Sequence, residues 1–220
     1  MDKLRLRFSK KGRAVYISHL DLMHTMQRAF SRAGYELKYS EGYNPHPILS
    51  IALPLSVGAS SVCELLDFKL KDDVNLGELP GRLNAALPEG IEVHEAYEAE
   101  RKISELKWLE INGVFEYDNT NAGEMLPSLR EFFGSEEIVI SKKSKRGMSE
   151  TDIRPMIKEL RFEERDGNSV FLKALISAQE PTLNPELIVD ALRQKKPVIA
   201  PDFAAFTRIE TYDSALKLFR

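Results

Sequence analysis

Hydrophobic and polar positions recur along the chain with two periodicities, one typical of strands and the other of helices. Residues 3–9 alternate basic and apolar side chains, and this period of two places the charges on one face of a strand. Residues 19–33 repeat apolar side chains every three or four positions, which predicts an amphipathic helix. Ser18, followed by Asp21, is suited to cap the start of this helix, and Gly34 is suited to end it.

The same order of elements is predicted twice along the chain. In the first half, helices are predicted over residues 19–33 and 76–86, and strands over 3–9, 35–39, 48–53, 62–70 and 91–96. The second half repeats this order, with helices over residues 122–133 and 185–195 and strands over 108–115, 138–141, 157–164, 170–177 and 205–212. Both halves approximate β-α-β-β-α-β, in which two helices cover one face of an antiparallel sheet. We therefore expect an α+β chain of two ferredoxin-like halves, residues 1–104 and 105–220.

Composition restricts the chemistry that the chain can support. With 220 residues and 43% hydrophobic positions, the chain can bury substantial cores. It contains no apolar run of roughly eighteen residues, and its first residues lack the apolar stretch of a secretory signal, so we expect a cytoplasmic protein without a membrane partner. The single cysteine, Cys63, cannot form an internal disulfide or hold an iron–sulfur cluster by itself. We expect no cofactor and no metal site.

Basic side chains are concentrated in two places, although the net charge is only −3. One group follows the first strand and the turn after it and comprises Lys3, Arg5, Arg7, Lys10, Lys11 and Arg13. The other comprises Lys142, Lys143, Lys145 and Arg146. This second run lies in residues 141–148, where the charges and Gly147 predict an exposed loop. Arg154 follows it and offers a planar fork of donors to a phosphate or to a carboxylate.

Two interpretations of these basic groups remain open. Solvated strand faces and local salt bridges also place cations at a surface, and Arg154 could simply pair with Asp152. An all-basic face, however, is the kind of surface that releases counterions from a nucleic-acid backbone. The basic groups therefore predict RNA binding by electrostatic contacts, which contribute affinity more than sequence choice.

Residues 18–54 carry polar side chains that a helix alone does not require. On the predicted helix, His24 and Arg28 project from the solvent face. Pro45 and Pro47 restrict the backbone around them, so the ring of His46 is held on a stiff arm. Prolines of this kind also protect the edge of a sheet, which is the structural alternative. The side chains of this block that we expect to contact RNA are His24, Arg28, Tyr43, Asn44 and His46.

Three stretches of sequence carry a specific pattern: YISHLDLMHTMQRAFSRAG, YSEGYNPHPILSIALPLSVG and ISKKSKRGMSETDIRPMIKEL. Together they resemble the radical SAM-linked protein family, a group of uncharacterised bacterial domains, over nearly the whole chain. Members of that family occur alone or fused behind a radical SAM domain, and are often encoded near ribosomal proteins and a ribonuclease. The resemblance implies an association with radical SAM enzymes and names no reaction.

The cysteine count limits what this association can be. A radical SAM enzyme holds an iron–sulfur cluster through several cysteines, whereas this chain has one. The chain is therefore not the catalyst of that chemistry. We expect an RNA-binding accessory protein that holds or positions tRNA or rRNA for a partner radical SAM enzyme, without catalysis by this chain alone.

Two alternative functions remain open. In the first, His19 and His46 act as acid and base in a metal-independent endoribonuclease. A metal site of three histidines is disfavoured, because His19 and His24 lie about 140° apart around an ideal helix. In the second, the chain is a protein-interaction scaffold that binds no nucleic acid and uses its acidic central stretch.

Overall fold

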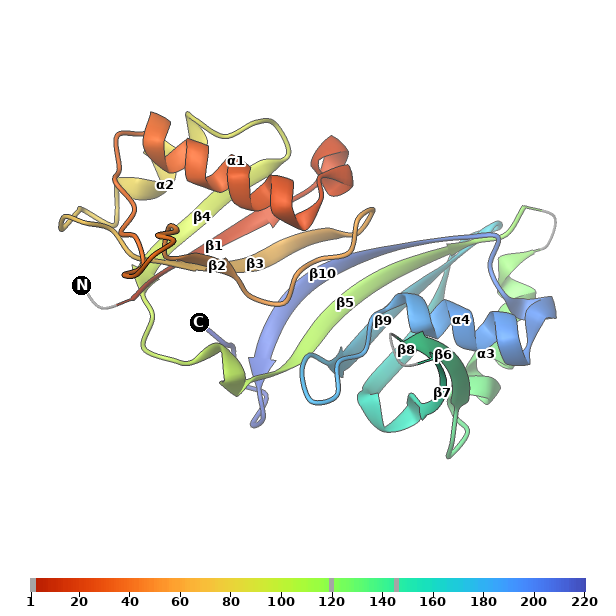
Figure 1. Cartoon of the computed structure of the whole chain (residues 1–220). Coiled ribbons are helices and arrows are strands. Elements are labelled where there is room, and N and C mark those ends of the chain that lie inside the picture. The colour runs from red at the N-terminus through yellow and green to blue at the C-terminus, as the bar shows by residue number, and fades with distance from the viewer. Residues whose placement is uncertain (1–2, 119–120, 145–146) are drawn as a thin grey trace. The chain divides into compact units, whose positions relative to one another are not determined.

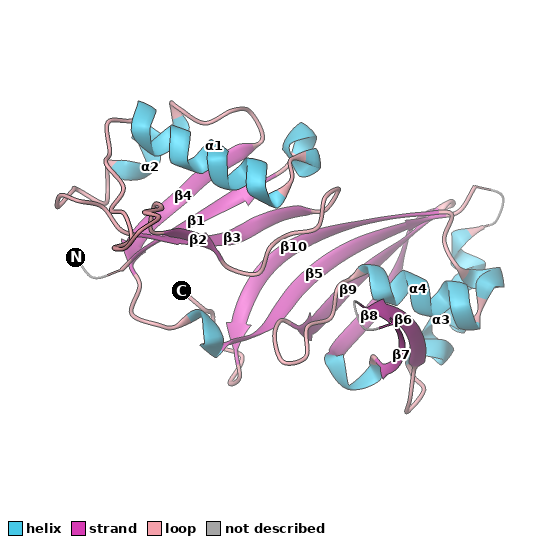
Figure 2. Cartoon of the chain, in the orientation of Figure 1, coloured by secondary structure: helices cyan, strands magenta, loops and turns pink. Residues whose placement is uncertain are grey.

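The computed structural model describes residues 3–118, 121–144 and 147–220 and shows a chain of helices and antiparallel sheet (Figures 1 and 2). The chain divides into two compact units, which we call unit 1 (Met1–Glu105 together with Arg220) and unit 2 (Leu106–Phe219). The α+β class and the antiparallel pairing predicted from the sequence are confirmed.

Unit 1 contains a sheet with two α-helices. Its elements in chain order are β1 (Leu4–Lys10), η1 (Gly12–Tyr16), α1 (His19–Arg32), β2 (Leu49–Ile51), β3 (Ser60–Phe68), α2 (Leu79–Asn84), β4 (Ile91–Glu98) and η2 (Ile103–Glu105). Within the unit the strands lie in the order β4-β1-β3-β2, and each neighbouring pair is antiparallel.

The core of unit 1 forms between α1 and the sheet. Leu6 of β1 and Phe68 of β3 are fully buried, as are Met26 and Phe30 of α1. The rings of Phe30 and Phe68 lie 4.9 Å apart, close enough for a favourable aromatic contact. The apolar face predicted for the first strand and the apolar stripe predicted for the first helix are thus both confirmed by the side chains that they bury.

The predicted boundaries of α1 are also confirmed. The backbone N–H of Asp21 donates to the Ser18 hydroxyl at 3.2 Å, which satisfies one of the free donors at the start of the helix. The Ser18 hydroxyl in turn donates to the Asp21 carboxylate at 2.7 Å. At the other end, Gly34 has a φ of 81°, a conformation that favours glycine after a helix.

The strand predicted over residues 35–39 is wrong as a regular element. Isolated bridges join Leu37 to Leu70 and Tyr39 to Pro47 in its place. Pro47 has no backbone N–H to donate, so the ladder cannot continue past it. The chain instead folds back on itself: Ile48 N–H donates to Lys38 O at 2.8 Å and closes an arm, residues 38–48, beside α1.

Unit 2 repeats the order of unit 1 and adds a two-stranded ribbon. Its elements are β5 (Leu106–Glu116), α3 (Ala122–Phe133), β6 (Val139–Ser144), β7 (Gly147–Asp152), η3 (Arg154–Met156), β8 (Ile157–Asp166), β9 (Ser169–Ser177), α4 (Glu186–Lys195), η4 (Pro197–Ile199) and β10 (Phe203–Asp213). Its strands lie in the order β10-β5-β9-β8, again antiparallel, and β6 pairs with β7 as a separate ribbon.

The ribbon corrects one prediction and the turn between β8 and β9 confirms another. Residues 141–148 were expected to form an exposed loop, but Ser141 pairs with Glu150 and Ser144 with Gly147 across β6 and β7. The charged side chains do not prevent this pairing, because the strands are joined through their backbone and the side chains of β7 are exposed or half-buried. The hairpin predicted at residues 166–168 is present. None of the described helices is long and apolar enough to cross a membrane.

Candidate nucleic-acid interface

The arm at residues 38–48 holds the histidine that the sequence singles out. Ser40 and His46 close its loop: Ser40 N–H donates to His46 O at 2.9 Å, and His46 N–H donates to the Ser40 hydroxyl at 3.1 Å. The same hydroxyl lies 3.0 Å from Nδ1 of the His46 ring. These contacts orient the imidazole, while Tyr43 at the tip of the loop is fully exposed.

A second feature is a hollow of about 480 Å³ beside β8, which we call the β8 groove. It lies on unit 2, where β8 is the last strand in the order of the unit's sheet. Phe133 and Phe162 provide apolar parts of its lining. Among the described residues that line it, one is acidic, Glu163, and four are cationic: Arg130, Arg154, Lys158 and Arg161.

Two of these cations are fixed by main-chain carbonyls of the groove itself. Arg130 Nη2 donates to Phe162 O at 2.9 Å, and Arg154 Nη1 donates to Ile157 O at 2.8 Å. Arg154 Nε also donates to Ser135 O at 3.2 Å. Neither contact neutralises the charge, because the acceptors are uncharged carbonyl oxygens. The guanidinium groups therefore present positive charge in a set geometry and also cover the edge of β8 against unwanted strand pairing.

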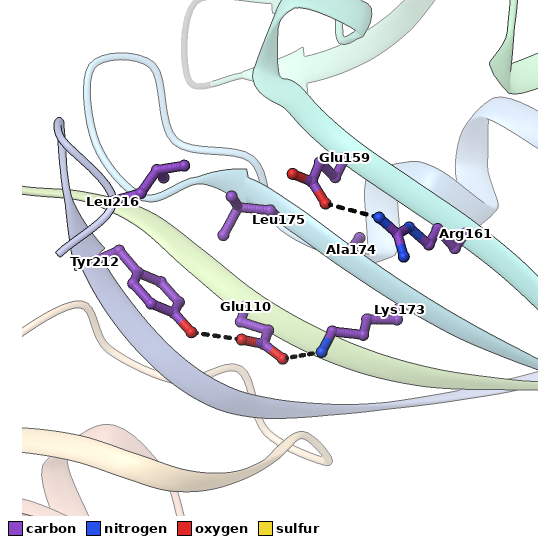
Figure 3. Close-up of a pocket in the computed structure, with 8 residues that line it drawn as sticks. All are labelled: Glu110, Glu159, Arg161, Lys173, Ala174, Leu175, Tyr212 and Leu216. Atoms are coloured by element: carbon purple, nitrogen blue, oxygen red, sulfur yellow. Dashed lines mark hydrogen bonds and ion pairs between the residues drawn. The ribbon is translucent and has the colours of Figure 1, made fainter. Parts of the chain in front are cut away.

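A third feature is a hollow of about 290 Å³ on the sheet of unit 2, which we call the sheet hollow (Figure 3). Glu110 on β5 lies between Tyr212 and Lys173 in its lining. Tyr212 donates its hydroxyl hydrogen to Glu110 Oε2 at 2.7 Å, and Lys173 Nζ lies 2.6 Å from Glu110 Oε1. Ala174, Leu175 and Leu216 complete the apolar lining. Arg161 and Glu159, whose Nη2 and Oε2 atoms lie 3.6 Å apart, also line this hollow, and Arg161 lines the β8 groove as well.

The environment of Glu110 keeps it ionised. Its side chain is only 17% exposed, and this burial by itself raises the pKa of the carboxyl. The hydrogen bonds from Lys173 and Tyr212 act in the opposite direction and dominate, so the pKa lies below its usual value. Glu110 is therefore a carboxylate at neutral pH, suited to accept hydrogen bonds and unsuited to donate a proton.

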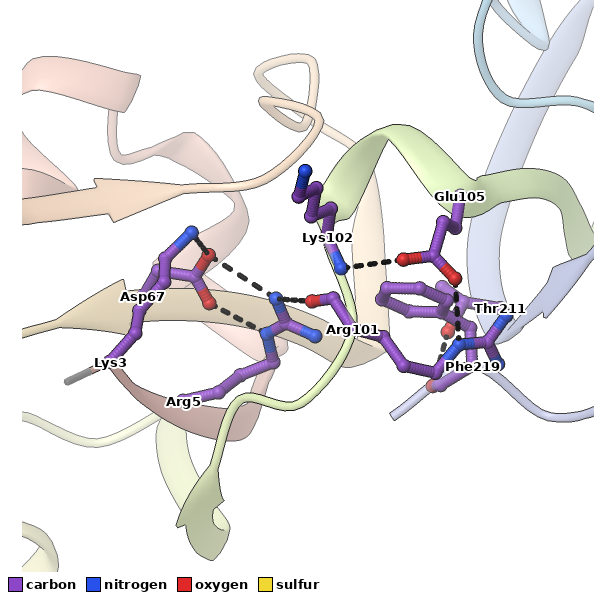
Figure 4. Close-up of polar contacts among 8 residues, drawn as sticks. All are labelled: Lys3, Arg5, Asp67, Arg101, Lys102, Glu105, Thr211 and Phe219. Carbon is purple, nitrogen blue, oxygen red and sulfur yellow. Dashed lines mark hydrogen bonds and ion pairs between the residues drawn. The ribbon is translucent and has the colours of Figure 1, made fainter. Parts of the chain in front are cut away.

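The structure corrects the basic face predicted for β1, because Arg5 is completely buried (Figure 4). Its Nε lies 2.6 Å from Asp67 Oδ1 and its Nη2 lies 3.3 Å from Asp67 Oδ2, an arrangement in which two parallel bonds join the two side chains. Arg5 Nη2 also donates to Arg101 O at 2.9 Å, and Lys3 binds the same carboxylate at 2.6 Å. The charge of Arg5 is therefore paired within unit 1 and does not contribute to a basic surface.

Lys10 is the second correction, since its side chain is 1% exposed. Its ammonium donates to Ile17 O at 2.8 Å and to Val15 O at 3.2 Å, and so anchors η1 to the sheet. Burial lowers the pKa of Lys10, and the charge of the buried Glu64 offsets part of that effect. In the sequence Lys10 falls at the same parity as the buried residues Leu4, Leu6 and Phe8, so its charge and not the strand alternation was the reason to expect it at the surface.

The remaining predicted residues are distributed over separate parts of the surface. Arg7, His19 and Arg154 are half-buried. The exposed residues are Lys11, Arg13, His24, Arg28, Tyr43, Asn44, His46 and Lys142. The side chain of Lys143, and the whole of Lys145 and Arg146, lie outside what the structure describes. No group of three or more potential metal ligands occurs among the residues that were placed.

Sequence reasoning identified Arg154 but missed its neighbours in the groove and the sheet hollow. Lys158 and Arg161 are separated from Arg130 by a ribbon and a turn, and Glu110, Lys173 and Tyr212 come from three different strands. The available signal was alternation: Lys173 and Glu110 occupy polar positions on strands whose neighbouring residues are buried. Such positions look like an ordinary solvent-facing side of a sheet until the strand order is known.

Comparison with known protein families assigns the chain to a family. Residues 3–185 match the model of a family described as an uncharacterized protein conserved in bacteria (DUF2344). The chain belongs to this family. The match supports the part of the predicted resemblance that concerns an uncharacterised bacterial family, and the link to radical SAM enzymes stays a prediction. A search of curated proteins found no match to the sequence.

Solved structures show a likeness of fold. A chain from the crystal structure of a Cbf5-Nop10-Gar1 complex aligns with a TM-score of 0.56 at 9% identity, over 94% of this chain and 48% of that one. The chain therefore spans about half the length of the structure that it matches. At this identity the likeness concerns the fold alone. An unknown protein from Galdieria sulphuraria aligns over 94% of this chain and 97% of its own at 10% identity, with a TM-score of 0.28.

Proposed function

We propose that this protein binds RNA and that the β8 groove carries part of the RNA backbone. The observation that supports the proposal is the lining of the groove, in which four cationic side chains accompany one acidic side chain among the described residues. Cations gathered in a hollow attract phosphates and release condensed counterions when RNA binds. The predicted RNA-binding residue Arg154 belongs to this set.

The cations of the groove have two different tasks in this proposal. Arg130 and Arg154 are held by carbonyl oxygens, so they provide a pre-organised positive field. Lys158 and Arg161 are exposed and carry weaker contacts: Lys158 lies 5.0 Å from the ring of Trp108, and Arg161 lies 3.6 Å from Glu159. These two side chains can turn toward phosphates at little cost to stability.

We further propose that both units are ferredoxin-like. In unit 1 the last strand, β4, lies beside the first, β1, and β3 lies between β1 and β2. In unit 2 the last strand, β10, lies beside the first, β5, and β9 lies between β5 and β8. Unit 2 departs from this order by the inserted ribbon β6–β7. Antiparallel sheets with helices on one face leave the other face available to a ligand, a use that RNA-binding domains make of their sheets.

The proposal also names the kind of RNA and the protein partner. The resemblance of three sequence stretches to the radical SAM-linked family supports a role in which the chain presents tRNA or rRNA to a radical SAM enzyme. Co-purification separates this role from RNA binding alone. A complex that survives ribonuclease treatment indicates direct protein contact, whereas a complex that ribonuclease dissolves indicates that RNA joins the two proteins.

Charge reversal tests RNA binding by the groove. We expect wild-type protein to bind bacterial tRNA or rRNA fragments with an affinity that falls steeply as salt rises. Lys158→Glu combined with Arg161→Glu should weaken binding and reduce the slope of log affinity against log salt by about 2. The matched control, Lys196→Glu with Lys217→Glu, makes the same change of charge at exposed sites outside the groove. Equal loss in both double variants, or no binding by wild-type protein at low salt, would refute the proposal.

The endoribonuclease alternative has one observation in its favour, namely the fixed ring of His46. In this function RNA is cleaved in the presence of a chelator, and His46→Ala abolishes cleavage because the ring takes or donates the proton. His94→Ala, an exposed histidine on β4, is the control. RNA that stays intact through a long incubation with wild-type protein excludes this alternative.

A further inference from the structure

The sheet hollow presents three hydrogen-bonding side chains in a fixed spatial order. Figure 3 shows Lys173, Glu110 and Tyr212 following one another along the hollow, joined by contacts of 2.6 and 2.7 Å. The ammonium of Lys173 uses one proton on Glu110 and keeps others to donate. The carboxylate has unused lone pairs, and the hydroxyl oxygen of Tyr212, having donated its hydrogen, can only accept. The hollow therefore offers a donor, an acceptor and a second acceptor in that order.

This order complements the pairing edge of guanine. Guanine offers O6 as an acceptor, followed by the N1–H and the N2 amino group as donors. Uracil also begins with an acceptor and a donor, but it places its O2 acceptor against the acceptor Tyr212. Adenine satisfies Lys173 and Glu110 through N1 and its amino group, and leaves nothing for Tyr212. Cytosine, in either direction, sets at least one pair of like groups against each other. Guanine alone satisfies all three side chains.

The shape of the hollow suits a base that has left its stack. Its volume of about 290 Å³ is near the lower end for ligand pockets, and Ala174, Leu175 and Leu216 give it an apolar lining. Unpaired bases in RNA are recognised by apolar or aromatic contact with the ring together with hydrogen bonds to the edge. The hollow supplies both kinds of contact from β5, β9 and β10 and from the turn after β10.

The position of Arg161 connects this hollow to the β8 groove. Arg161 lines both, and it lies directly across from Lys173 in the pairing of β8 with β9. Each of the two cations has an acidic neighbour: Glu159 lies 3.6 Å from Arg161, and Glu110 lies 2.6 Å from Lys173. The longer contact of Arg161, which is exposed, leaves this side chain the more able of the two to turn toward a phosphate. A phosphate at Arg161 would place its nucleotide at the mouth of the sheet hollow while the backbone continues along the groove.

We infer that the sheet hollow binds an unpaired guanine of the RNA whose backbone occupies the β8 groove, with Lys173 on O6 and with Glu110 and Tyr212 on N1–H and the amino group. This inference rests on the proposed function and deepens it from backbone binding to recognition of one base. Glu110, pinned by its two neighbours, is the residue that sets the position of the base.

Substituted oligonucleotides test the recognition. Three single-stranded RNAs of one length carry guanosine, inosine or adenosine at a single position, with no other guanosine. Inosine lacks the N2 amino group and differs from guanosine in nothing else. We expect the guanosine RNA to bind wild-type protein about tenfold more tightly than the inosine RNA, the effect of one or two lost hydrogen bonds. Tyr212→Phe should remove most of this difference and of the preference over adenosine, because both depend on the Tyr212 acceptor. Glu110→Gln should remove both preferences too, because Glu110 holds Tyr212 and Lys173 in place.

Controls separate loss of recognition from loss of structure. Glu116→Gln changes the same type of residue on the same strand outside the hollow, and should keep the full preference for guanosine. Chemical denaturation of each variant checks that the fold is retained. Equal affinity of wild-type protein for all three RNAs, with the salt dependence intact, overturns the guanine inference and leaves the proposed function standing.

Free nucleotides test the hollow when no RNA binds. Failure of all three RNAs to bind overturns the proposed function. In that event guanosine monophosphate and inosine monophosphate are titrated separately, and the methyl resonances of Leu175 and Leu216 are followed by NMR. Shifts that are larger with guanosine monophosphate, and that Glu110→Gln removes, support the base site by itself. Methyl resonances that do not move overturn it.

Discussion

Arg5 and Asp67 form a buried pair in which the guanidinium of Arg5 binds both oxygens of the carboxylate, at 2.6 and 3.3 Å. Arg5 is completely buried and Asp67 is 4% exposed. A pair of this kind is costly to break from one side only, because the remaining charge is left in a poorly solvating environment. The residue pair thus links β1 to β3 by charge as well as by their ladder.

The first prediction concerns this pair. Asp67→Ala should lower the free energy of unfolding by about 3–5 kcal/mol, because it leaves Arg5 buried without its carboxylate. Chemical denaturation measures the change. Glu98→Ala, an exposed acid on the neighbouring strand β4, should change stability by less than about 0.5 kcal/mol. Equal effects of the two substitutions would show that the buried pair has no special weight.

The second prediction concerns two glycines that differ in their surroundings. A Cβ on Gly90, whose φ is 88°, would lie 2.5 Å from Lys11 O and 2.9 Å from Ala14 Cβ. Gly90→Ala should therefore destabilise the protein by about 2 kcal/mol or more, through both strain and collision. Gly81 lies in α2 with nothing near its missing Cβ, so Gly81→Ala should stabilise by up to about 1 kcal/mol. Thermal unfolding of both variants compares them, and the opposite order would contradict the packing described around η1.

The third prediction concerns the stability of the protein at high pH. Burial raises the pKa of Tyr117 to about 12, and its hydroxyl donates to Ile199 O at 3.1 Å. In the unfolded chain a tyrosine loses its proton near pH 10. Between about pH 10 and 12 the unfolded state thus binds fewer protons than the native state, so stability falls as pH rises. Stability is fully present below about pH 10.

A difference measurement isolates this contribution. Denaturation midpoints of wild-type protein and Tyr117→Phe are compared from pH 8 to pH 12. The wild-type midpoint should fall more steeply above pH 10, because phenylalanine has no proton to lose. Parallel curves for the two proteins would mean that Tyr117 titrates alike in the folded and unfolded chains.

The fourth prediction concerns the arm that carries His46. The Ser40 hydroxyl accepts the backbone N–H of His46, so Ser40→Ala leaves that donor exposed to solvent. Hydrogen exchange at the His46 amide should accelerate about five- to tenfold, the effect of about 1 kcal/mol of local stability. Ser50→Ala, at an exposed position of β2, should leave the His46 amide unchanged. An unchanged rate in Ser40→Ala would mean that the prolines and the main-chain hydrogen bonds hold the arm closed without the Ser40 hydroxyl.

Local signals account for the parts of the fold that were predicted well. Helix α1 begins and ends where Ser18 and Gly34 indicate, because capping and a left-handed residue depend on neighbours within one turn. The hairpin at residues 166–168 is local for the same reason. The ribbon β6–β7 was missed because its charged side chains resemble those of a loop, although cross-strand pairing can tolerate charge at exposed positions.

The candidate site depends on contacts that the order of residues does not reveal. Arg154 could be selected from its position beside a basic run, but its place in a groove with Arg130 and Arg161 depends on how α3 packs against β8. Glu110 and Tyr212 are 102 positions apart, and only the adjacency of β5 and β10 brings them together.

The sequence by itself determined the class of fold, the order of its elements and the ends of its best-capped helix, because periodicity and capping act over a few residues. The tertiary structure decided which charges reach the surface. Arg5 alternates with apolar residues in the sequence and Lys10 lies between Ser9 and Lys11, and both are buried, since an opposing carboxylate or nearby carbonyl oxygens can replace water around a cation. The carboxylate that binds Arg5 lies 62 positions away in the chain, so strand alternation could not show that this basic residue is hidden.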